Sequence, residues 1–424
     1  MNEITDPVKY KMQVKCALHL VLTVGALIFK SSEEPNKLKN LVSMFGHGSV
    51  YAMAPKNASE QFRYWMANNY KKNKEIQAFF SMQSTNKMAK NRNKKYFLPI
   101  ETNMKIFVPP LTPELELDET ERYDSLTDET FLEIVNDRSE TVRVEGTEFH
   151  TNRLEHDPNT HVKIRVLHNK PVSADSPQKC DFAILQFHGG GFVMGDSCSH
   201  QNYTRKWAID LGIPVFCVDY RLAPQHPFPT PINDCYQAYM WLVTQAKDQL
   251  GLDIDKWIFA GDSAGGHLTF SVTMVAMLRG ARLPDAVFSH YPVYVTSNQY
   301  FNPSMVLCLD EELVNLGFMS YGRGAFTIKG GDNEKNVLLS PLLAPDEMLK
   351  RFPPSKIMAV ENDPLRDQAY DMTLRILKLG GSCKLILMKD YIHGFQNFDK
   401  TIDEYKIGTL KTIEHFASLH EQIR

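Results

Sequence analysis

Short strand-like runs rich in apolar residues recur from residue 162 onward, each four to seven residues long. Runs of this length predict strands that are buried on both faces of a sheet. They cover residues 162–168, 182–187, 215–219, 257–260, 286–290, 357–360 and 384–388. Stretches with helical spacing follow most of them, at residues 199–211, 231–249, 264–279 and 365–379. This alternation predicts an α/β fold, a mostly parallel doubly wound sheet with its site at the carboxyl ends of the strands.

The chain of 424 residues exceeds the usual size of one domain, so a catalytic domain with an added region is expected. We predict an N-terminal helical region at residues 1–104 and a catalytic domain at residues 105–424. Within the latter, the interval of about 295–354 separates two predicted strands and is too long for an ordinary loop. We expect it to hold helices that cover the site.

The N-terminal region contains an apolar run of 14 residues, 16–29, flanked by Lys15 and Lys30. A membrane span needs about 20 residues. A buried helix is the favoured interpretation, and a signal anchor or a membrane-surface segment stays open.

Charge is distributed unevenly along the chain, although the formal net charge is only −3. Residues 61–100 contain nine Lys or Arg and one acid, together with six aromatic residues before position 81, whereas residues 111–150 contain thirteen Asp or Glu and three Arg. A basic surface with aromatic side chains predicts peripheral association with a lipid droplet or membrane surface. Alternatively, the basic stretch is a solvated face or a lid helix that pairs with the acidic stretch.

Composition excludes several classes of function. The small net charge gives no reason to expect a nucleic-acid partner, and the chain has no phosphate-binding glycine loop of the P-loop or Rossmann type and no H-E-x-x-H or C-x-x-C motif. Seven scattered cysteines favour reduced thiols and a cytoplasmic location. Two N-glycosylation patterns, at Asn57 and Asn202, argue weakly for a secreted protein. The oligomeric state is not predicted.

The strongest chemical signal is G-x-S-x-G at residues 261–265, between a predicted strand and a predicted helix. A serine hydroxyl is a weak nucleophile until a base takes its proton, and a sharp strand-to-helix turn exposes its oxygen to such a base. Glycines on both sides let the backbone bend tightly. Ser263 is therefore the predicted nucleophile.

A second motif, His188-Gly189-Gly190-Gly191-Phe192, follows the predicted strand at residues 182–187. Adjacent glycines leave peptide N–H groups uncovered, so a developing negative charge can approach them closely. We expect an oxyanion hole of Gly189, Gly190, Gly191 and Ala264, in which the last three donate and Gly189 shapes the turn.

Five motifs in this order resemble the hormone-sensitive lipase family of α/β-hydrolases, over roughly residues 105–398. They are the two motifs above, Asp219-Tyr-Arg-Leu-Ala-Pro224, Asp363-Pro-Leu-Arg-Asp367 and His393-Gly-Phe395. The resemblance implies an α/β-hydrolase fold whose cap combines the 295–354 interval with N-terminal helices. His267 stands where the family often has asparagine, and we expect it to affect packing. We expect His188 and Asp262 to brace their loops.

In α/β-hydrolases the base and its carboxylate follow the nucleophile in the order Ser, Asp or Glu, His. Asp363 comes after the predicted strand at 357–360, and His393 comes after the strand at 384–388. Asp367 competes for the carboxylate role, but Pro364 suits a first helical turn and leaves Asp363 in the loop. We predict Ser263, Asp363 and His393 as the catalytic residues.

These residues predict a carboxylic-ester hydrolase that works through an acyl-serine intermediate and needs no metal or cofactor. The family resemblance implies acylglycerols, related lipid esters or small acyl esters as its substrates. An amidase or deacetylase would use the same residues. A ligand-binding receptor on the same fold is a third alternative, and the presence of His393 argues against it.

Overall fold

The computed structural model describes residues 97–112, 116–117, 123, 126–138, 159–297, 300, 302–308, 311, 313–314, 316–327, 335–399 and 403–424. Several sequence predictions lie outside these residues: the apolar run 16–29, the basic stretch up to residue 96, the pattern at Asn57 and part of the acidic stretch. In the described part of the chain, no helix is long and apolar enough to cross a membrane.

Eight strands form one sheet in the order β1-β2-β4-β3-β5-β6-β7-β8. They are β1 Thr102–Val108, β2 Val162–His168, β3 Gln178–Phe187, β4 Val215–Asp219, β5 Leu252–Asp262, β6 Ala286–His290, β7 Ser355–Val360 and β8 Cys383–Met388. β2 pairs antiparallel with both β1 and β4, and every other pairing is parallel. The predicted α/β class with a mostly parallel sheet is confirmed.

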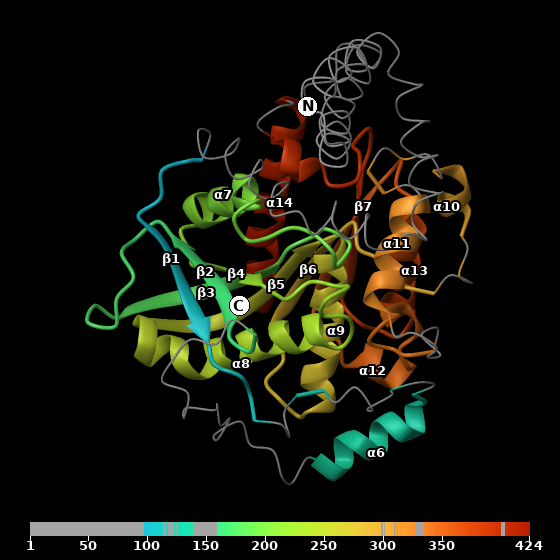
Figure 1. Cartoon of the computed structure of the whole chain (residues 1–424), viewed down its shortest axis with the longest axis horizontal. Coiled ribbons are helices and arrows are strands. Elements are labelled where there is room, and N and C mark those ends of the chain that lie inside the picture. Colours follow the sequence, from blue (N-terminus) through green and yellow to red (C-terminus); the bar gives the residue numbers. More distant parts are fainter. Residues whose placement is uncertain are drawn as a thin grey trace, which may run out of the picture.

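The helices are α6 Asp128–Arg138, α7 Gln201–Leu211, α8 Thr230–Leu250, α9 Ala264–Leu278, α10 Pro303–Leu307, α11 Leu316–Phe326, α12 Asp346–Lys350, α13 Arg366–Lys378 and α14 Asp403–Ile423. Two 3-10 helices, η1 Pro341–Leu343 and η2 Phe395–Phe398, complete the set. α7 and α14 lie on one face of the sheet, and α8 and α9 lie on the other (Figure 1).

Helices on both faces explain why the strand sequences are almost entirely apolar. Along β4, Val215 and Cys217 join the core beneath α7 and α14, whereas Phe216 and Val218 join the core beneath α8 and α9. Successive side chains of a strand point to opposite faces, so both faces must be hydrophobic. The carboxyl ends of the parallel strands then meet at one edge of the sheet.

The interval of about 295–354 holds α10, α11, η1 and α12. Part of it lies directly on the glycine motif. A Cβ built at Gly191 would lie 2.8 Å from the ring of Phe318, and one at Gly322 would lie 3.1 Å from the Gly191 carbonyl oxygen. α11 therefore packs against the loop that carries the predicted oxyanion hole.

The sheet begins earlier than the sequence patterns predict. β1 starts at Thr102, opposite His168 of β2, so it crosses the expected boundary between residues 104 and 105. Along β1 the side chains alternate between covered and exposed positions, as on an edge strand covered on one face, and the strand therefore lacks a continuous apolar run. β5 is also longer than predicted, because its first five residues mix apolar with charged side chains and only Leu252 among them is buried.

Candidate active site

The G-x-S-x-G motif forms a sharp turn between β5 and α9. Ser263 has φ 57° and ψ −117°, a conformation that a residue with a side chain rarely adopts. A Cβ at Gly261 would lie 2.3 Å from the Gly265 carbonyl oxygen, and a Cβ at Gly265 would lie 1.9 Å from the Phe187 carbonyl oxygen. Only glycine fits at these two positions, so the motif encodes the strained turn through sterics.

The turn is also held from the neighbouring strand. The Ser263 N–H donates to the His290 carbonyl oxygen at 2.9 Å, and the Ser263 carbonyl accepts from the His267 N–H at 3.1 Å. All fifteen residues of α9 are buried. Ser263 therefore sits on a helix that cannot move without disturbing the core.

The glycine motif forms a tight loop after β3. Gly190 and Gly191 have φ 119° and 60°, and the Gly190 carbonyl accepts hydrogen bonds from the N–H groups of Val193 and Met194. Among the residues that the structure describes, none accepts a hydrogen bond from the N–H of Gly190, Gly191 or Ala264. These three donors remain available to a ligand.

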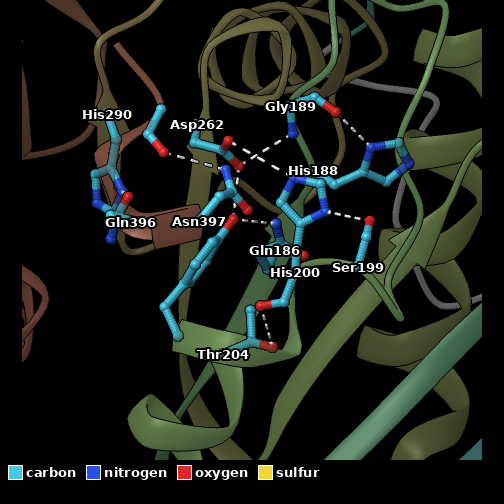
Figure 2. Close-up of polar contacts among 12 residues, drawn as sticks. Gln186, His188, Gly189, Ser199, His200, Thr204, Asp262, His290, Gln396 and Asn397 are labelled. Carbon is cyan, nitrogen blue, oxygen red and sulfur yellow. Dashed lines mark hydrogen bonds and ion pairs between the residues drawn. The ribbon is translucent and has the colours of Figure 1, made fainter. Parts of the chain in front are cut away.

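Gly189 differs from its neighbours because its N–H is already used. It donates to Oδ1 of Asp262 at 3.0 Å, and the Tyr203 hydroxyl donates to the same oxygen at 2.7 Å. Figure 2 shows the Asp262 carboxylate reaching from the serine turn to Gly189. Asp262 thus ties the serine turn to the glycine loop through the Gly189 N–H.

His188 braces the other side of the loop. Its Nδ1 lies 2.8 Å from the Gly189 carbonyl oxygen, and its ring stacks on Tyr220 with the ring centres 4.1 Å apart. Burial lowers the pKa of His188 to about 4, with a smaller contribution from His200. The imidazole is therefore neutral at physiological pH and can donate its proton to the carbonyl.

Asp363 and His393 meet beyond the ends of β7 and β8. Oδ2 of Asp363 lies 2.7 Å from Nδ1 of His393, and Oδ1 accepts a hydrogen bond from the Leu365 N–H at 2.8 Å. Asp363 is 0% exposed and His393 is 4% exposed. A hydrogen bond at Nδ1 directs Nε2, the other ring nitrogen, away from the carboxylate.

The charge around His393 opposes the effect of burial. Burial by itself would lower the pKa of the imidazole, but the charge of Asp363, its hydrogen bond, and the charges of Glu311 and Asp262 together hold the pKa above its ordinary value. The surroundings therefore favour the protonated imidazole. That is the species which forms when a histidine takes a proton from a nucleophile.

The end of β6 connects the serine turn with His393. The His290 carbonyl accepts the Ser263 N–H, and the ring of the next residue, Tyr291, packs edge-on against His393 at 4.9 Å. Gln396 holds the side chains of His290 and Tyr291 in place, because its Oε1 accepts a hydrogen bond from each of them at 2.9 Å. Ser263, Asp363 and His393 thus follow β5, β7 and β8 at one edge of the sheet, where Asp363 contacts His393 and the end of β6 connects this pair with the serine turn.

The other residues singled out in the sequence have structural partners. Asp367 accepts a hydrogen bond from the Ser304 N–H at 2.7 Å and contacts Arg366, away from the His393 ring nitrogen that Asp363 holds. Both ring nitrogens of His267 lie 2.9 Å from carbonyl oxygens, those of Val293 and Leu338. His267 therefore joins α9 to the segment before η1, which agrees with its predicted packing role.

Sequence patterns do not indicate Tyr203, Gln396 or Glu311. The contacts of Tyr203 and Gln396 join residues 59 and 106 positions apart, Glu311 acts in a local turn, and none of the three belongs to a catalytic motif. Their burial could be anticipated only for Tyr203, which lies on the covered face of a predicted helix. In the described part of the chain, no three His, Cys, Asp or Glu side chains are arranged to hold a metal ion.

Residues 184–397 match the family described as the alpha/beta hydrolase fold. Hormone-sensitive lipase of Mus musculus is 42% identical over 137 residues, which are 32% of this chain and 18% of that protein. Ethyl acetate hydrolase of Pseudomonas putida is 31% identical over 241 residues, which are 57% of this chain and 74% of that protein. The matched stretches span 12 to 24% of four mammalian hormone-sensitive lipases.

The fold is also that of a solved esterase. The hyperthermophilic esterase of Pyrobaculum calidifontis has a TM-score of 0.63 and 22% identity, and the likeness covers 83% of this chain and 92% of that one. The family match extends over half of the chain and includes the serine turn, Asp363 and His393. The chain therefore belongs to the alpha/beta hydrolase family, and within it is similar to hormone-sensitive lipases and to bacterial esterases.

Proposed function

We propose that the chain hydrolyses carboxylic esters with Ser263 as nucleophile, His393 as base and Asp363 as the carboxylate that orients the base. The observation that carries the proposal is the buried contact of 2.7 Å between His393 Nδ1 and Asp363 Oδ2. Such a contact fixes the tautomer in which Nε2 can accept a proton. The Tyr291 ring and the end of β6 connect this pair with the serine turn.

In the first half of the reaction, the Ser263 hydroxyl oxygen attacks the ester carbonyl while His393 takes its proton. Negative charge develops on the former carbonyl oxygen, and the N–H groups of Gly190, Gly191 and Ala264 can receive it. One donor of this kind is worth about 3 kcal/mol in the transition state. When the tetrahedral intermediate collapses, His393 gives its proton to the leaving alcohol and the acyl group stays on Ser263.

In the second half, a water molecule loses a proton to His393 and attacks the acyl-serine. The oxyanion forms at the same donors, and its collapse releases the carboxylic acid and returns the proton to Ser263. Asp363 keeps its charge throughout and stabilises the imidazolium in both halves.

We propose acylglycerols or related lipid esters as the substrates. Apolar side chains of the 295–354 interval gather beside the loop that carries Asp363, where Met305, Val314 and Met319 pack with Leu365. α10 also exposes Val306 and Leu307, at 60% and 71%. Apolar surroundings of this kind suit a long acyl chain better than a polar substrate. Turnover of p-nitrophenyl esters, diacylglycerol and cholesteryl ester would rank the substrates directly.

The nucleophile is tested by a fluorophosphonate probe and by Ser263→Ala. We expect the probe to label Ser263 alone, and the variant to lose about 10⁶-fold in kcat while it stays folded, because the three side chains act as a unit. Labelling of the Ser263→Ala protein, or esterase activity near the original level, would refute the assignment.

We further propose that the basic stretch helps to dock the protein on an anionic lipid surface. The support is the sequence pattern alone, in which each basic residue near a membrane can contribute about 1 kcal/mol. The test replaces five lysines by glutamine: Lys71, Lys72, Lys74, Lys94 and Lys95. Binding to anionic liposomes should weaken, added salt should mimic the effect, and turnover of a soluble short-chain ester should stay nearly unchanged. Loss of that turnover with unchanged liposome binding would favour a lid instead.

A further inference from the structure

Glu311 is a buried carboxylate in the interval between β6 and β7, at 5% exposure. Burying a carboxylate is costly unless hydrogen bonds and nearby positive charge compensate for the lost water. Oε2 of Glu311 accepts a hydrogen bond from the Leu313 N–H at 2.7 Å and another, shorter one from the Val314 N–H. The carboxylate therefore holds the backbone of Leu313 and Val314 in place, and we call Glu311, Leu313 and Val314 together the Glu311 turn.

The Glu311 turn lies against both loops that carry the proposed base and its carboxylate. A Cβ at Gly394, the residue after His393, would lie 3.6 Å from Cδ1 of Leu313. Val314 packs in the same cluster as Leu365, which is two residues after Asp363. One turn thus touches the chain beside His393 on one side and beside Asp363 on the other.

The geometry points to Glu311 as a positioning residue for His393: it fixes the Glu311 turn against the His393 loop and brings a second negative charge into this part of the site. This inference rests on the proposed function, because it assigns to His393 the role of base. In that role His393 becomes positively charged in the transition state, and a second carboxylate stabilises that charge without touching the substrate.

The charges of three carboxylates on different elements act on the imidazole. Asp363 contacts Nδ1, Asp262 lies at the serine turn, and Glu311 belongs to the turn whose Leu313 lies against the loop of His393. Tyr291 packs on the ring as a neutral group. The charge of Glu311 acts in the same direction as that of Asp363 and opposes the effect of burial on the imidazole.

The test measures the acidic limb of the pH profile of kcat/KM, which reports the protonation of the free base. Glu311→Gln keeps the shape of the side chain and an oxygen that can accept from Leu313 and Val314, but removes the charge. Without that charge His393 protonates less readily. The acidic limb should therefore move to lower pH, by about one unit, and the plateau of kcat should fall about three- to tenfold.

Two matched variants separate charge from shape. Glu311→Asp keeps the charge and shortens the side chain, so its acidic limb should stay near that of the unchanged protein even if kcat falls. Glu347→Gln removes a carboxylate from α12, where the side chain pairs with Lys350, and should leave the profile unchanged. A limb that does not move in Glu311→Gln, or that moves equally in Glu311→Asp, would overturn the proposal.

A second measurement does not depend on turnover. NMR titration of His393 in the Ser263→Ala background should give a lower imidazole pKa when Glu311→Gln is added. An unchanged imidazole pKa would overturn the role of Glu311 even if the esterase proposal holds. Conversely, an active Ser263→Ala protein would defeat the esterase proposal without bearing on this titration.

Discussion

His393 and His290 lie in adjacent regions of the site, on either side of the Tyr291 ring, and both are almost fully buried at 4% and 0% exposure. Nδ1 of His393 contacts the Asp363 carboxylate at 2.7 Å, whereas Nδ1 of His290 contacts the Gln396 amide oxygen at 2.9 Å. The pKa of His393 is raised, and burial lowers the pKa of His290 to about 4.

The difference between the two histidines lies in the charge of the partner. Burial disfavours an imidazolium in both regions, and a neutral amide stabilises the positive charge too little to offset the cost of burial. A buried carboxylate stabilises the charge enough to offset it. The β8 loop can therefore hold a histidine that gains and loses a proton, while the end of β6 holds a neutral histidine that serves as a structural hydrogen-bond donor.

The largest expected effect comes from replacing the carboxylate partner of His393 by an amide, so that its surroundings resemble those of His290. Asp363→Asn should lower kcat about 10⁴-fold, because an amide can hold the imidazole in the wrong tautomer and cannot stabilise its charge. Steady-state kinetics with a soluble ester measures this loss.

Asp367→Asn is the matched control for that variant. Asp367 contacts Ser304 and Arg366, so its loss should act mainly on stability, by about 1 kcal/mol, and leave kcat within about tenfold. If Asp367→Asn abolished turnover and Asp363→Asn did not, the carboxylate would be wrongly assigned.

Acid should destabilise the protein through its neutral buried histidines. Burial lowers the pKa of His188, His267 and His290 to about 4, below the ordinary value of 6.5. Between pH 6.5 and 4 the unfolded chain binds these protons and the native state does not, so stability falls as the pH falls.

Each of the three contributes up to about 1.4 kcal/mol per pH unit in that window, and together they contribute about 4 kcal/mol per unit. Urea unfolding at several pH values measures the slope. A free energy of unfolding that stayed constant from pH 6.5 to 5 would contradict the assignment of these three side chains as neutral.

Gln396→Glu makes the reverse change, because it gives His290 a carboxylate partner. The pKa of His290 should rise from about 4 to above 6.5, a shift of more than about two units. NMR titration of the imidazole checks this, with Gln396→Met as a control of similar size that adds no charge. An unchanged pKa in Gln396→Glu would show that burial, and not the partner, sets the protonation of buried histidines here.

The serine turn and the glycine loop could be predicted from the sequence because sterics at single positions specify them. At Gly261, Gly265 and Gly190 any side chain would collide with backbone atoms. The positions of the glycines in the motifs therefore predict the geometry of both turns. Seven of the eight strands were also predictable, since each contains a stretch rich in apolar residues that packs into the core.

The elements that the sequence does not predict are those with mixed patterns. β1 alternates between covered and exposed positions. α14 packs on the sheet through positions at helical spacing that include two buried threonines, Thr409 and Thr412, and the Thr412 hydroxyl accepts a hydrogen bond from Trp207. Glu311 and Gln396 become significant only after folding brings them beside a histidine.

The smallest expected effect concerns the tie between the serine turn and the glycine loop. The hydroxyl of Tyr203 is fully buried and donates to the Asp262 oxygen that also holds the Gly189 N–H. Tyr203→Phe removes this donor and leaves the aromatic packing in place, so Asp262 loses one of its two fixed points on that oxygen. A hydrogen bond to a charged group is worth about 1.5–3 kcal/mol, and part of this should appear as a less rigid oxyanion loop. We expect kcat to fall about tenfold with KM little changed, because the loop acts on the transition state more than on the bound ester.

Tyr220→Phe is the control, since its hydroxyl donates to the His188 carbonyl on the other side of the same loop and makes no contact with Asp262. If both variants lost stability while kcat stayed unchanged, the Asp262 tie would serve the fold alone, and the geometry of the oxyanion hole would depend only on the glycines.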